Sequence, residues 1–166
     1  MTAERACGTC SLCCKLPSIA ALKKPADTWC THCRPGNGGC LIYANRPSAC
    51  RMFNCGWLNP FSWDGVLPIT EEWFPARCHF YLAYDDMMCV VVNVDPDFPD
   101  AWRAEPYYSA LWASPCPVVL IRVGRRSIWL NKETGPGSEE TKVRTQAQVD
   151  REFKARCRKF AEDKPR

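Results

Sequence analysis

The sequence lacks several features that would indicate a function directly. It contains no apolar run long enough to cross a bilayer, and its first residues have neither the basic region nor the apolar stretch of a secretory signal. It also has no Ser-His-Asp arrangement of recognisable spacing, no phosphate-cradling glycine motif and no pair of candidate catalytic carboxylates. We therefore expect a cytoplasmic protein with no membrane segment, and we favour a non-enzymatic role.

Length and composition indicate a folded chain with much turn structure. The 166 residues fit one domain, the hydrophobic content is 46%, and 14 prolines and 9 glycines punctuate the sequence. We expect one compact unit with two lobes, a cysteine-rich lobe at residues 1–60 and an α+β lobe at residues 61–166. A segment rich in Trp, Phe and Pro, from Gly56 to Pro75, is expected to pack the two lobes together.

Cysteine is the strongest bias in the composition. Thiols in a reducing compartment stay available to metals, so thirteen cysteines without an export signal favour metal ligation over disulfides. Nine candidate ligands lie before residue 56: Cys7, Cys10, Cys13, Cys14, Cys30, Cys33, Cys40, Cys50 and Cys55. The remaining four cysteines, at 78, 89, 116 and 157, are scattered singly, and Cys157 is expected to be a small buried hydrophobe.

The spacing of these nine residues is typical of a metal site. Residues 7–14 contain two overlapping C-x-x-C steps followed directly by a fourth cysteine, Cys14. A C-x-x-C turn lets two sulfurs converge on one metal ion. Four sulfurs complete one tetrahedral zinc site, so nine candidates imply two ions or one cluster. Because Cys13 and Cys14 should point in different directions, we favour two Zn²⁺ ions in a structural or interaction module. An iron–sulfur cluster that assists a redox or protein-modification reaction, and a metal carrier, are the alternatives.

Other residues near the cysteines have supporting interpretations. Arg46 and Arg51 are expected to lie beside the thiolates and offset their charge, although an anionic substrate or partner is a second interpretation. His32 is expected to lie beside the ligands rather than to bind metal. Pro17 occupies the position of the fourth cysteine of a bacterial ferredoxin run, which argues against an ordinary ferredoxin.

The cysteine pattern resembles a known family, the YkgJ-like cysteine-cluster proteins, described as zinc- or iron-chelating. The matching residues are Cys7-x-x-Cys10-x-x-Cys13-Cys14, Cys33, and the run Cys40-Leu-Ile-Tyr-Ala-Asn-Arg46-Pro-Ser-Ala-Cys50-Arg51-Met-Phe53. The resemblance covers about the first third of the chain and implies metal chelation by the matched cysteines. Some relatives resemble flagellin lysine methylases with an iron–sulfur centre, so a redox or methyl-transfer role follows only by analogy. Cys30, His32 and Cys55 lie outside the matched core.

The charge pattern does not favour nucleic acid. Eight thiolates and two divalent ions would change the formal charge of +4 to zero, and only residues 122–166, with 13 basic and 7 acidic groups, would stay basic. We interpret that segment as a solvated helix face rather than a phosphate-binding surface. A protein partner is compatible with the sequence, which does not identify it. The acidic stretch Asp95-Pro-Asp97-Phe-Pro-Asp100 lacks the glycine and distal glutamate of an EF-hand and is interpreted as a solvated turn.

The rest of the chain predicts a small antiparallel sheet with β-β-α-β-β order. Strands are expected at 79–84 and 87–94 around an Asp85-Asp86 turn, and at 117–123 and 127–131 around Gly124. A short helix capped by Glu105 should run from Pro106 to Trp112. A flexible connection at 135–140 then leads to a helix at 146–162, with apolar positions Val149, Phe153, Cys157, Phe160 and Ala161. The expected class is therefore α+β.

Overall fold

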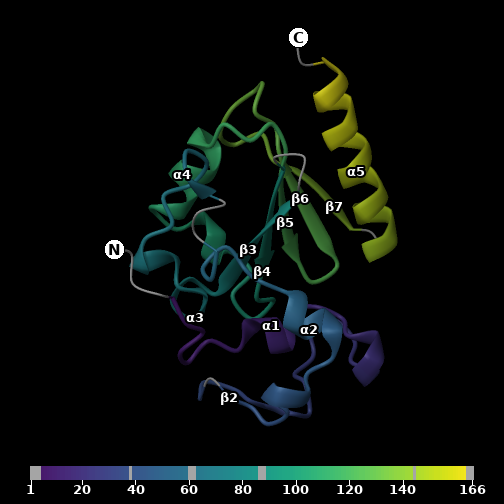
Figure 1. Ribbon diagram of the computed structural model, residues 1–166. Coiled ribbons are helices and arrows are strands. Elements are labelled where there is room, and N and C mark those ends of the chain that lie inside the picture. The colour runs from purple at the N-terminus through teal and green to yellow at the C-terminus, as the bar shows by residue number, and fades with distance from the viewer. Residues whose placement is uncertain (1–4, 38, 60–62, 86–88, 144, 164–166) are drawn as a thin grey trace.

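The fold consists of a mixed β-sheet with helices on both faces and an irregular N-terminal region below it (Figure 1). A computed structural model describes residues 5–37, 39–59, 63–85, 89–143 and 145–163. Within these residues, no helix is both long and apolar enough to span a membrane. The elements, with η for a 3₁₀-helix, are α1 (Leu12–Lys15), η1 (Ala20–Leu22), β1 (Cys33–Arg34), β2 (Gly39–Cys40), η2 (Tyr43–Asn45), α2 (Ser48–Met52), η4 (Glu71–Trp73), α3 (Pro75–Cys78), β3 (Phe80–Asp85), β4 (Cys89–Val94), η5 (Ala101–Arg103), α4 (Tyr107–Ala113), β5 (Val119–Val123), β6 (Arg126–Leu130), β7 (Glu140–Val143) and α5 (Gln146–Asp163).

The main sheet has the strand order β3-β4-β5-β6-β7. The α+β class, the β-β-α-β-β order and the C-terminal helix are confirmed. The sheet differs from a wholly antiparallel one because β4 and β5 are parallel, with Val90 opposite Val119 and Val94 opposite Val123. The segment that contains η5 and α4 connects them, and parallel neighbours need such a crossover connection.

Two local expectations also change. The segment at 135–140, which we expected to be a flexible connection, leads into a fifth strand, β7. This strand pairs with β6, with Glu140 opposite Trp129. Glu105 does not cap α4 with its side chain, because Pro106 is the N-cap residue and the Glu105 carboxylate accepts a hydrogen bond of 2.6 Å from Ser109 Oγ. Residue 86 of the expected β3–β4 turn, together with 87 and 88, lies outside the described residues.

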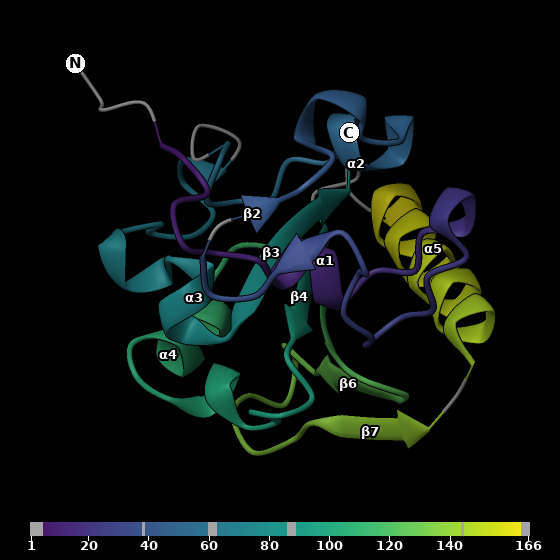
Figure 2. The same cartoon turned by 90° about the horizontal axis from the view of Figure 1, so that it is seen from below.

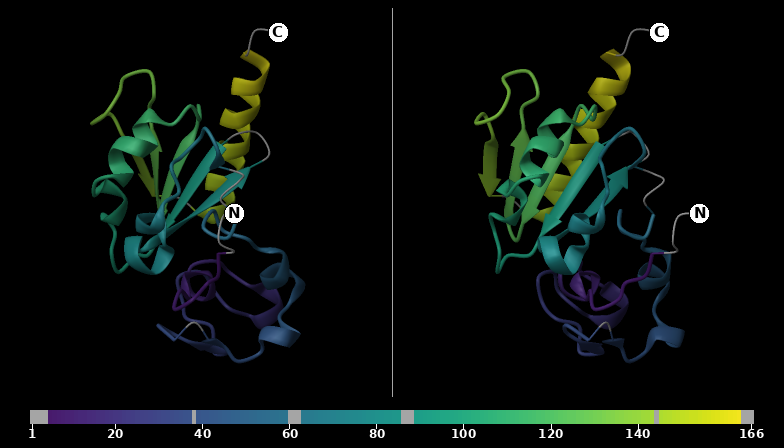
Figure 3. Two further views of the ribbon diagram at one scale, coloured as in Figure 1. Left: turned by 60° about the vertical axis from the view of Figure 1, so that its left-hand side comes forward. Right: turned by 90° about the vertical axis from the view of Figure 1, so that its left-hand side faces the viewer.

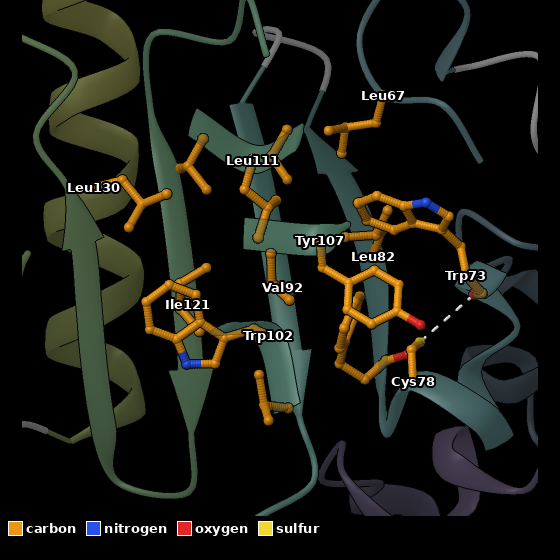
Figure 4. Close-up of a cluster of buried hydrophobic side chains, with 14 of the residues drawn as sticks. Leu67, Trp73, Cys78, Leu82, Val92, Trp102, Tyr107, Leu111, Ile121 and Leu130 are labelled. Carbon is orange, nitrogen blue, oxygen red and sulfur yellow. Dashed lines mark hydrogen bonds between the residues drawn. The ribbon is translucent and has the colours of Figure 1, made fainter. Parts of the chain in front are cut away.

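One face of the sheet packs against η5 and α4 (Figure 4). Trp102 of η5 and Leu111 of α4 have no exposed surface, and they share an apolar cluster with Val92 and Ile121 of the central strands. The sheet residues of this cluster recur at every second position of β4 and β5, as expected for one face of a strand. This cluster is the main core of the protein.

The opposite face of the sheet is covered by α5 (Figure 1). Val149, Phe153 and Cys157 recur every four residues and pack against Leu120 and Trp129, which confirms the predicted apolar helix face up to Cys157. The side chains of Phe160 and Ala161 lie outside what the structure describes.

A disulfide joins Cys157 of α5 to Cys89 of β4. The two residues are 68 positions apart, and their Cα atoms are 6.6 Å apart because α5 lies over the beginning of β4. Cys157 is buried on the apolar face as expected. The preference for metal ligation over disulfides therefore does not hold for this pair.

The N-terminal region has little apolar core. We call residues 5–59 the cysteine lobe; it lies at one end of the sheet (Figure 3). Its buried apolar cluster consists of Leu12 and Leu16, which pack against Tyr81 of β3. Its helices and strands are at most five residues long. Burial of apolar surface therefore stabilises this lobe much less than it stabilises the sheet.

The last residues of the cysteine lobe fasten it to the sheet and to the aromatic segment that follows. The Gly56 N–H donates to Leu82 O at 2.8 Å, and a Cβ atom on Gly56 would lie 2.7 Å from Trp63 Nε1, so only glycine fits. The Trp57 ring packs on Phe74, with centroids 5.1 Å apart. These contacts agree with the packing role predicted for the aromatic segment, of which Phe61 lies outside the described residues.

A buried ion pair makes a second connection between the cysteine lobe and the sheet. Lys15 Nζ of α1 lies 2.5 Å from Asp95 Oδ1 and 2.6 Å from Asp97 Oδ2, after the end of β4. The Lys15 and Asp95 side chains are each 6% exposed, whereas Asp97 is 72% exposed. Burial alone would lower the pKa of Lys15, but its hydrogen bonds with the two carboxylates outweigh this and raise the pKa. The interpretation of Asp95 as part of a solvated turn is wrong, because a buried ammonium needs a carboxylate beside it.

We predict that Asp95→Asn destabilises the protein far more than Asp97→Asn. The first change leaves a buried ammonium without its buried counter-charge and should cost about 3–5 kcal/mol. The second removes an exposed partner and should cost less than about 1 kcal/mol. Urea unfolding of the two variants measures the difference, and equal losses would contradict a specific role for the buried pair.

Candidate metal centre

Eight of the nine N-terminal cysteines line one cavity of about 330 Å³ inside the cysteine lobe. All nine are free thiols, and each is partly buried. The lining comes from five separate parts of the lobe: the first turn, α1, the chain before β1, β2, and the region of α2. The eight lining residues are Cys7, Cys10, Cys13, Cys14, Cys30, Cys40, Cys50 and Cys55.

Tight turns position the first cysteines. The Cys10 N–H donates to Cys7 O at 2.8 Å, and the Cys33 N–H donates to Cys30 O at 3.0 Å, so the C-x-x-C steps at 7–10 and 30–33 each close a turn. The Cys30 N–H donates to Cys14 O at 2.9 Å and so joins the two turns. Residues 7–14 and 30–33 are thereby held side by side.

A short hairpin positions Cys40. In the β1–β2 pair, Cys40 lies opposite Cys33, and the Leu41 N–H donates to His32 O at 2.8 Å. Cys50 belongs to α2, where its N–H donates to Pro47 O at 3.0 Å. The one-turn helix and the hairpin bring two distant cysteines to the cavity that the first turns also line. Figure 2 shows α1, α2 and β2 in the same region of the lobe.

Cys33 is the one candidate ligand that does not line the cavity. Its thiol instead lies beside that of Cys14, which contributes to the raised pKa of Cys33. The adjacent Cys13 likewise raises the pKa of Cys14, so these two thiols lie close together rather than pointing apart as we expected. Cys13, Cys14 and Cys33 therefore form a close group at one side of the cavity.

Burial keeps the Cys10 and Cys33 thiols protonated at neutral pH. Burial, opposed in part by the Leu12 N–H, raises the pKa of Cys10 to about 11, and burial with the neighbouring Cys14 raises the pKa of Cys33 to about 11. Burial and Cys55 raise the pKa of Cys7 in the same way. Thiols that raise one another's pKa become thiolates when a cation lies among them. The chemistry of the donor set therefore fits a divalent metal ion or a metal cluster.

Backbone N–H groups point at some of the sulfurs. Burial raises the pKa of Cys55, and hydrogen bonds from the N–H groups of Leu58 and Trp57 oppose that shift. Such N–H···S contacts are typical of turns around metal-bound thiolates. They favour a negatively charged sulfur at Cys55.

A buried lysine also faces the cavity, and the sequence reasoning missed it. Lys24 lines the cavity and donates from Nζ to Lys15 O at 2.7 Å, Pro17 O at 2.5 Å and Pro25 O at 2.9 Å. Burial lowers the pKa of Lys24, and the neighbouring Cys30 opposes part of this shift. A fixed ammonium at this place would offset part of the charge of bound thiolates. The position of Lys24 between two turns, next to Pro25, was the available sequence signal.

The predicted supporting residues differ in their placement. Arg46 and Arg51 both line the cavity, and Arg46 donates to Tyr43 O at 3.1 Å with its guanidinium 3.7 Å from the centroid of the Tyr43 ring. His32 is not among the lining residues. Arg46 and Arg51 are thus positioned to offset thiolate charge, and His32 contributes a backbone carbonyl to the hairpin.

The cysteines surround the cavity without forming a closed coordination shell. In the parts of the chain that the structure describes, no three His, Cys, Asp or Glu side chains are already arranged to hold an ion. Two other free cysteines lie outside the lobe, where Cys78 Sγ donates to Phe80 O at 3.2 Å and Cys116 is buried. Binding a metal ion would therefore require the thiols around the cavity to move.

Comparison with known proteins finds no matching family model, no matching curated protein and no matching solved structure.

Loading the reduced protein with Zn²⁺ at pH 7 should release protons, because raised pKa values keep several cavity thiols neutral beforehand, namely Cys7, Cys10, Cys14, Cys50 and Cys55. We expect about four protons for each four-sulfur ion. The apparent affinity should rise with pH, since fewer protons then have to be displaced. Calorimetric titration in buffers of different ionisation enthalpy counts the protons. Release of fewer than about two protons per ion would contradict thiol ligation.

Proposed function

We propose that the cysteine lobe binds zinc through clustered thiolates. The observation that carries this proposal is the shared cavity, which is lined by eight thiols from five parts of a lobe with little apolar core. Bound metal would replace the missing core, as it does in small metal-stabilised modules. Eight sulfurs are enough for two tetrahedral sites, so the proposed stoichiometry is two Zn²⁺ ions.

The proposed role is structural, with a protein partner and no reaction at the metal. Sites with four sulfur ligands leave no open position for substrate, which favours a scaffold over a catalyst. Tyr43 and Met52, next to the cavity on η2 and α2, are 62% and 81% exposed. Tyr and Met are enriched at protein interfaces, and this supports an interaction surface there. The free thiols of the lobe favour a reducing compartment such as the cytoplasm, although the Cys89–Cys157 disulfide counts against it.

An iron–sulfur cluster is the second candidate, favoured by two observations. The eight thiols share a single cavity rather than two, and the buried ammonium of Lys24 together with N–H donors at Cys55 would lower the charge of a cluster. Such a cluster would assist a redox or protein-modification reaction. The resemblance to the YkgJ-like family, described as zinc- or iron-chelating, is compatible with either metal.

Anaerobic purification followed by metal and sulfide analysis separates these proposals. Two zinc ions per colourless chain would support the first. Iron with acid-labile sulfide and a brown colour would favour the second. Rapid loss of zinc to a mild chelator would instead support a metal carrier, the third candidate. A folded, reduced protein that takes up neither metal would overturn all three.

We predict that Cys40→Ser lowers the metal content, whereas Cys116→Ser does not. Cys40 lines the cavity, while Cys116 is buried outside the cysteine lobe and serves as a matched control. Loss of one sulfur from a four-sulfur site should remove about one ion per chain and unfold the lobe around it. Metal analysis of the soluble fractions measures the first effect, and proteolysis within residues 7–55 measures the second. Equal metal content in the two variants would contradict ligation by Cys40.

A further inference from the structure

Lys24, a cationic residue that lines the cavity of the cysteine lobe, is fixed through both its backbone and its side chain. The Ile19 N–H donates to Lys24 O at 2.9 Å, and the Lys24 N–H donates to Ile19 O at 3.1 Å. The residue is 7% exposed, and its Nζ donates to the carbonyl oxygens of Lys15, Pro17 and Pro25. These hydrogen bonds hold the side chain in one position beside the thiols.

The hydrogen bonds of Lys24 require its side chain to be charged. An ammonium group has three N–H groups, whereas a neutral amine has one fewer. Because Nζ donates to three carbonyl oxygens, the side chain is an ammonium in this arrangement. Each of its N–H groups is used in this way and none is left for a sulfur, so Lys24 acts on the thiols through its charge alone.

The charge of Lys24 is not paired with a carboxylate in the parts of the chain that the structure describes. No ion pair there includes Lys24, and no Asp or Glu is among the described residues that line the cavity. The charge of Asp27 acts on Lys24, but Asp27 is exposed. A buried ammonium without a counter-charge is costly even where carbonyl groups bind it. The cavity is therefore short of negative charge while its thiols are neutral.

Three cysteines of the cavity lie close enough to Lys24 for their charges to act on it, namely Cys14, Cys30 and Cys50. The Cys30 N–H donates to Cys14 O at 2.9 Å, which joins the first two of them. The charges of Cys14 and Cys30 also act on Cys50, so the three sulfurs are neighbours. As thiolates they would supply the negative charge that Lys24 lacks, and a metal ion among them would cancel their mutual repulsion.

We propose that Lys24 is the built-in counter-charge of the metal-bound thiolates and raises the metal affinity of the cavity without touching the metal. The inference rests on the proposed metal binding and assigns a role to a residue that is not a ligand. Four thiolates and one Zn²⁺ ion carry two net negative charges, and the ammonium offsets one of them. A fixed charge beside partly buried thiolates acts on them strongly, because protein screens charges less than water does.

Competition with a chromogenic chelator measures the Zn²⁺ affinity of the reduced, full-length protein and of two variants. Lys24→Gln removes the ammonium, and it should raise the Kd by about tenfold or more. Lys132→Gln is the matched control, because Lys132 Nζ is also partly buried and donates to Leu111 O, Trp112 O and Ser114 O, outside the cysteine lobe. The control should change the Kd by less than about twofold. Equal weakening in both variants would assign the effect to lost stability and overturn the proposal.

Replacing Zn²⁺ with Co²⁺ gives a readout that lost stability does not change. Cobalt bound by thiolates absorbs light as an electron moves from sulfur to the metal, and a cation beside the sulfurs raises the energy of this transition because it stabilises their electrons. We therefore expect the sulfur-to-cobalt band of Lys24→Gln to shift to longer wavelength. Lys24→Arg keeps the charge, and it should retain the band position of the unchanged protein. An unshifted band in Lys24→Gln would contradict the proposal.

Asp27→Asn tests the same charge while leaving Lys24 in place. Asp27 is exposed and has a φ of +57°, a backbone conformation that asparagine adopts readily. Its carboxylate offsets part of the charge of Lys24, so its removal should lower the Zn²⁺ Kd by about twofold or more. An unchanged or higher Kd would count against the counter-charge, even where Lys24→Gln does not fold.

These measurements separate the role of Lys24 from the proposed function on which it rests. An unchanged protein that binds neither Zn²⁺ nor Co²⁺ would overturn both. An unchanged protein that binds them, together with a Lys24→Gln variant of equal affinity, would overturn the role of Lys24 alone.

Discussion

Thiols held around one cavity are the constraint on which the cysteine lobe depends. The lobe has a small apolar cluster, very short elements and many turns, so hydrophobic burial contributes little to its fold. Its turns instead direct eight sulfurs inward from chain segments that are far apart in sequence. In the proposed metal-bound state, a cation would lower the cost of gathering so many thiols and would stabilise the lobe.

The sheet provides a rigid support for that lobe. Its two faces are packed independently, one by η5 and α4 and the other by α5, and the central strands are almost completely buried. The cysteine lobe contacts the sheet at the end of β4, where Asp95 holds Lys15, and at Leu82 of β3, where Gly56 docks. Since Lys15 directly follows Cys14, the ion pair positions α1 relative to the sheet.

Local patterns predicted much of this arrangement. The alternation of apolar residues in β4 and β5, and the four-residue spacing of Val149, Phe153 and Cys157, identified strands and helix because each pattern depends on the nearby chain only. The cysteine spacing likewise identified eight residues that share the cavity. The parallel pairing of β4 with β5 was missed, since strand direction depends on how the α4 crossover packs. The Cys89–Cys157 disulfide and the burial of Asp95 beside Lys15 were also missed, because each is a contact between residues that are far apart in sequence.

The Lys15–Asp95 pair has a consequence for any attempt to transplant the cysteine lobe as an independent module. An excised segment ending near residue 59 would carry an ammonium whose main counter-charge stays behind in the donor protein. A recipient scaffold would have to supply an equivalent carboxylate at the docking surface, or a neutral residue would have to replace the lysine. Grafting the cysteines alone would therefore transfer the sulfur donors without the anchor that orients their first helix.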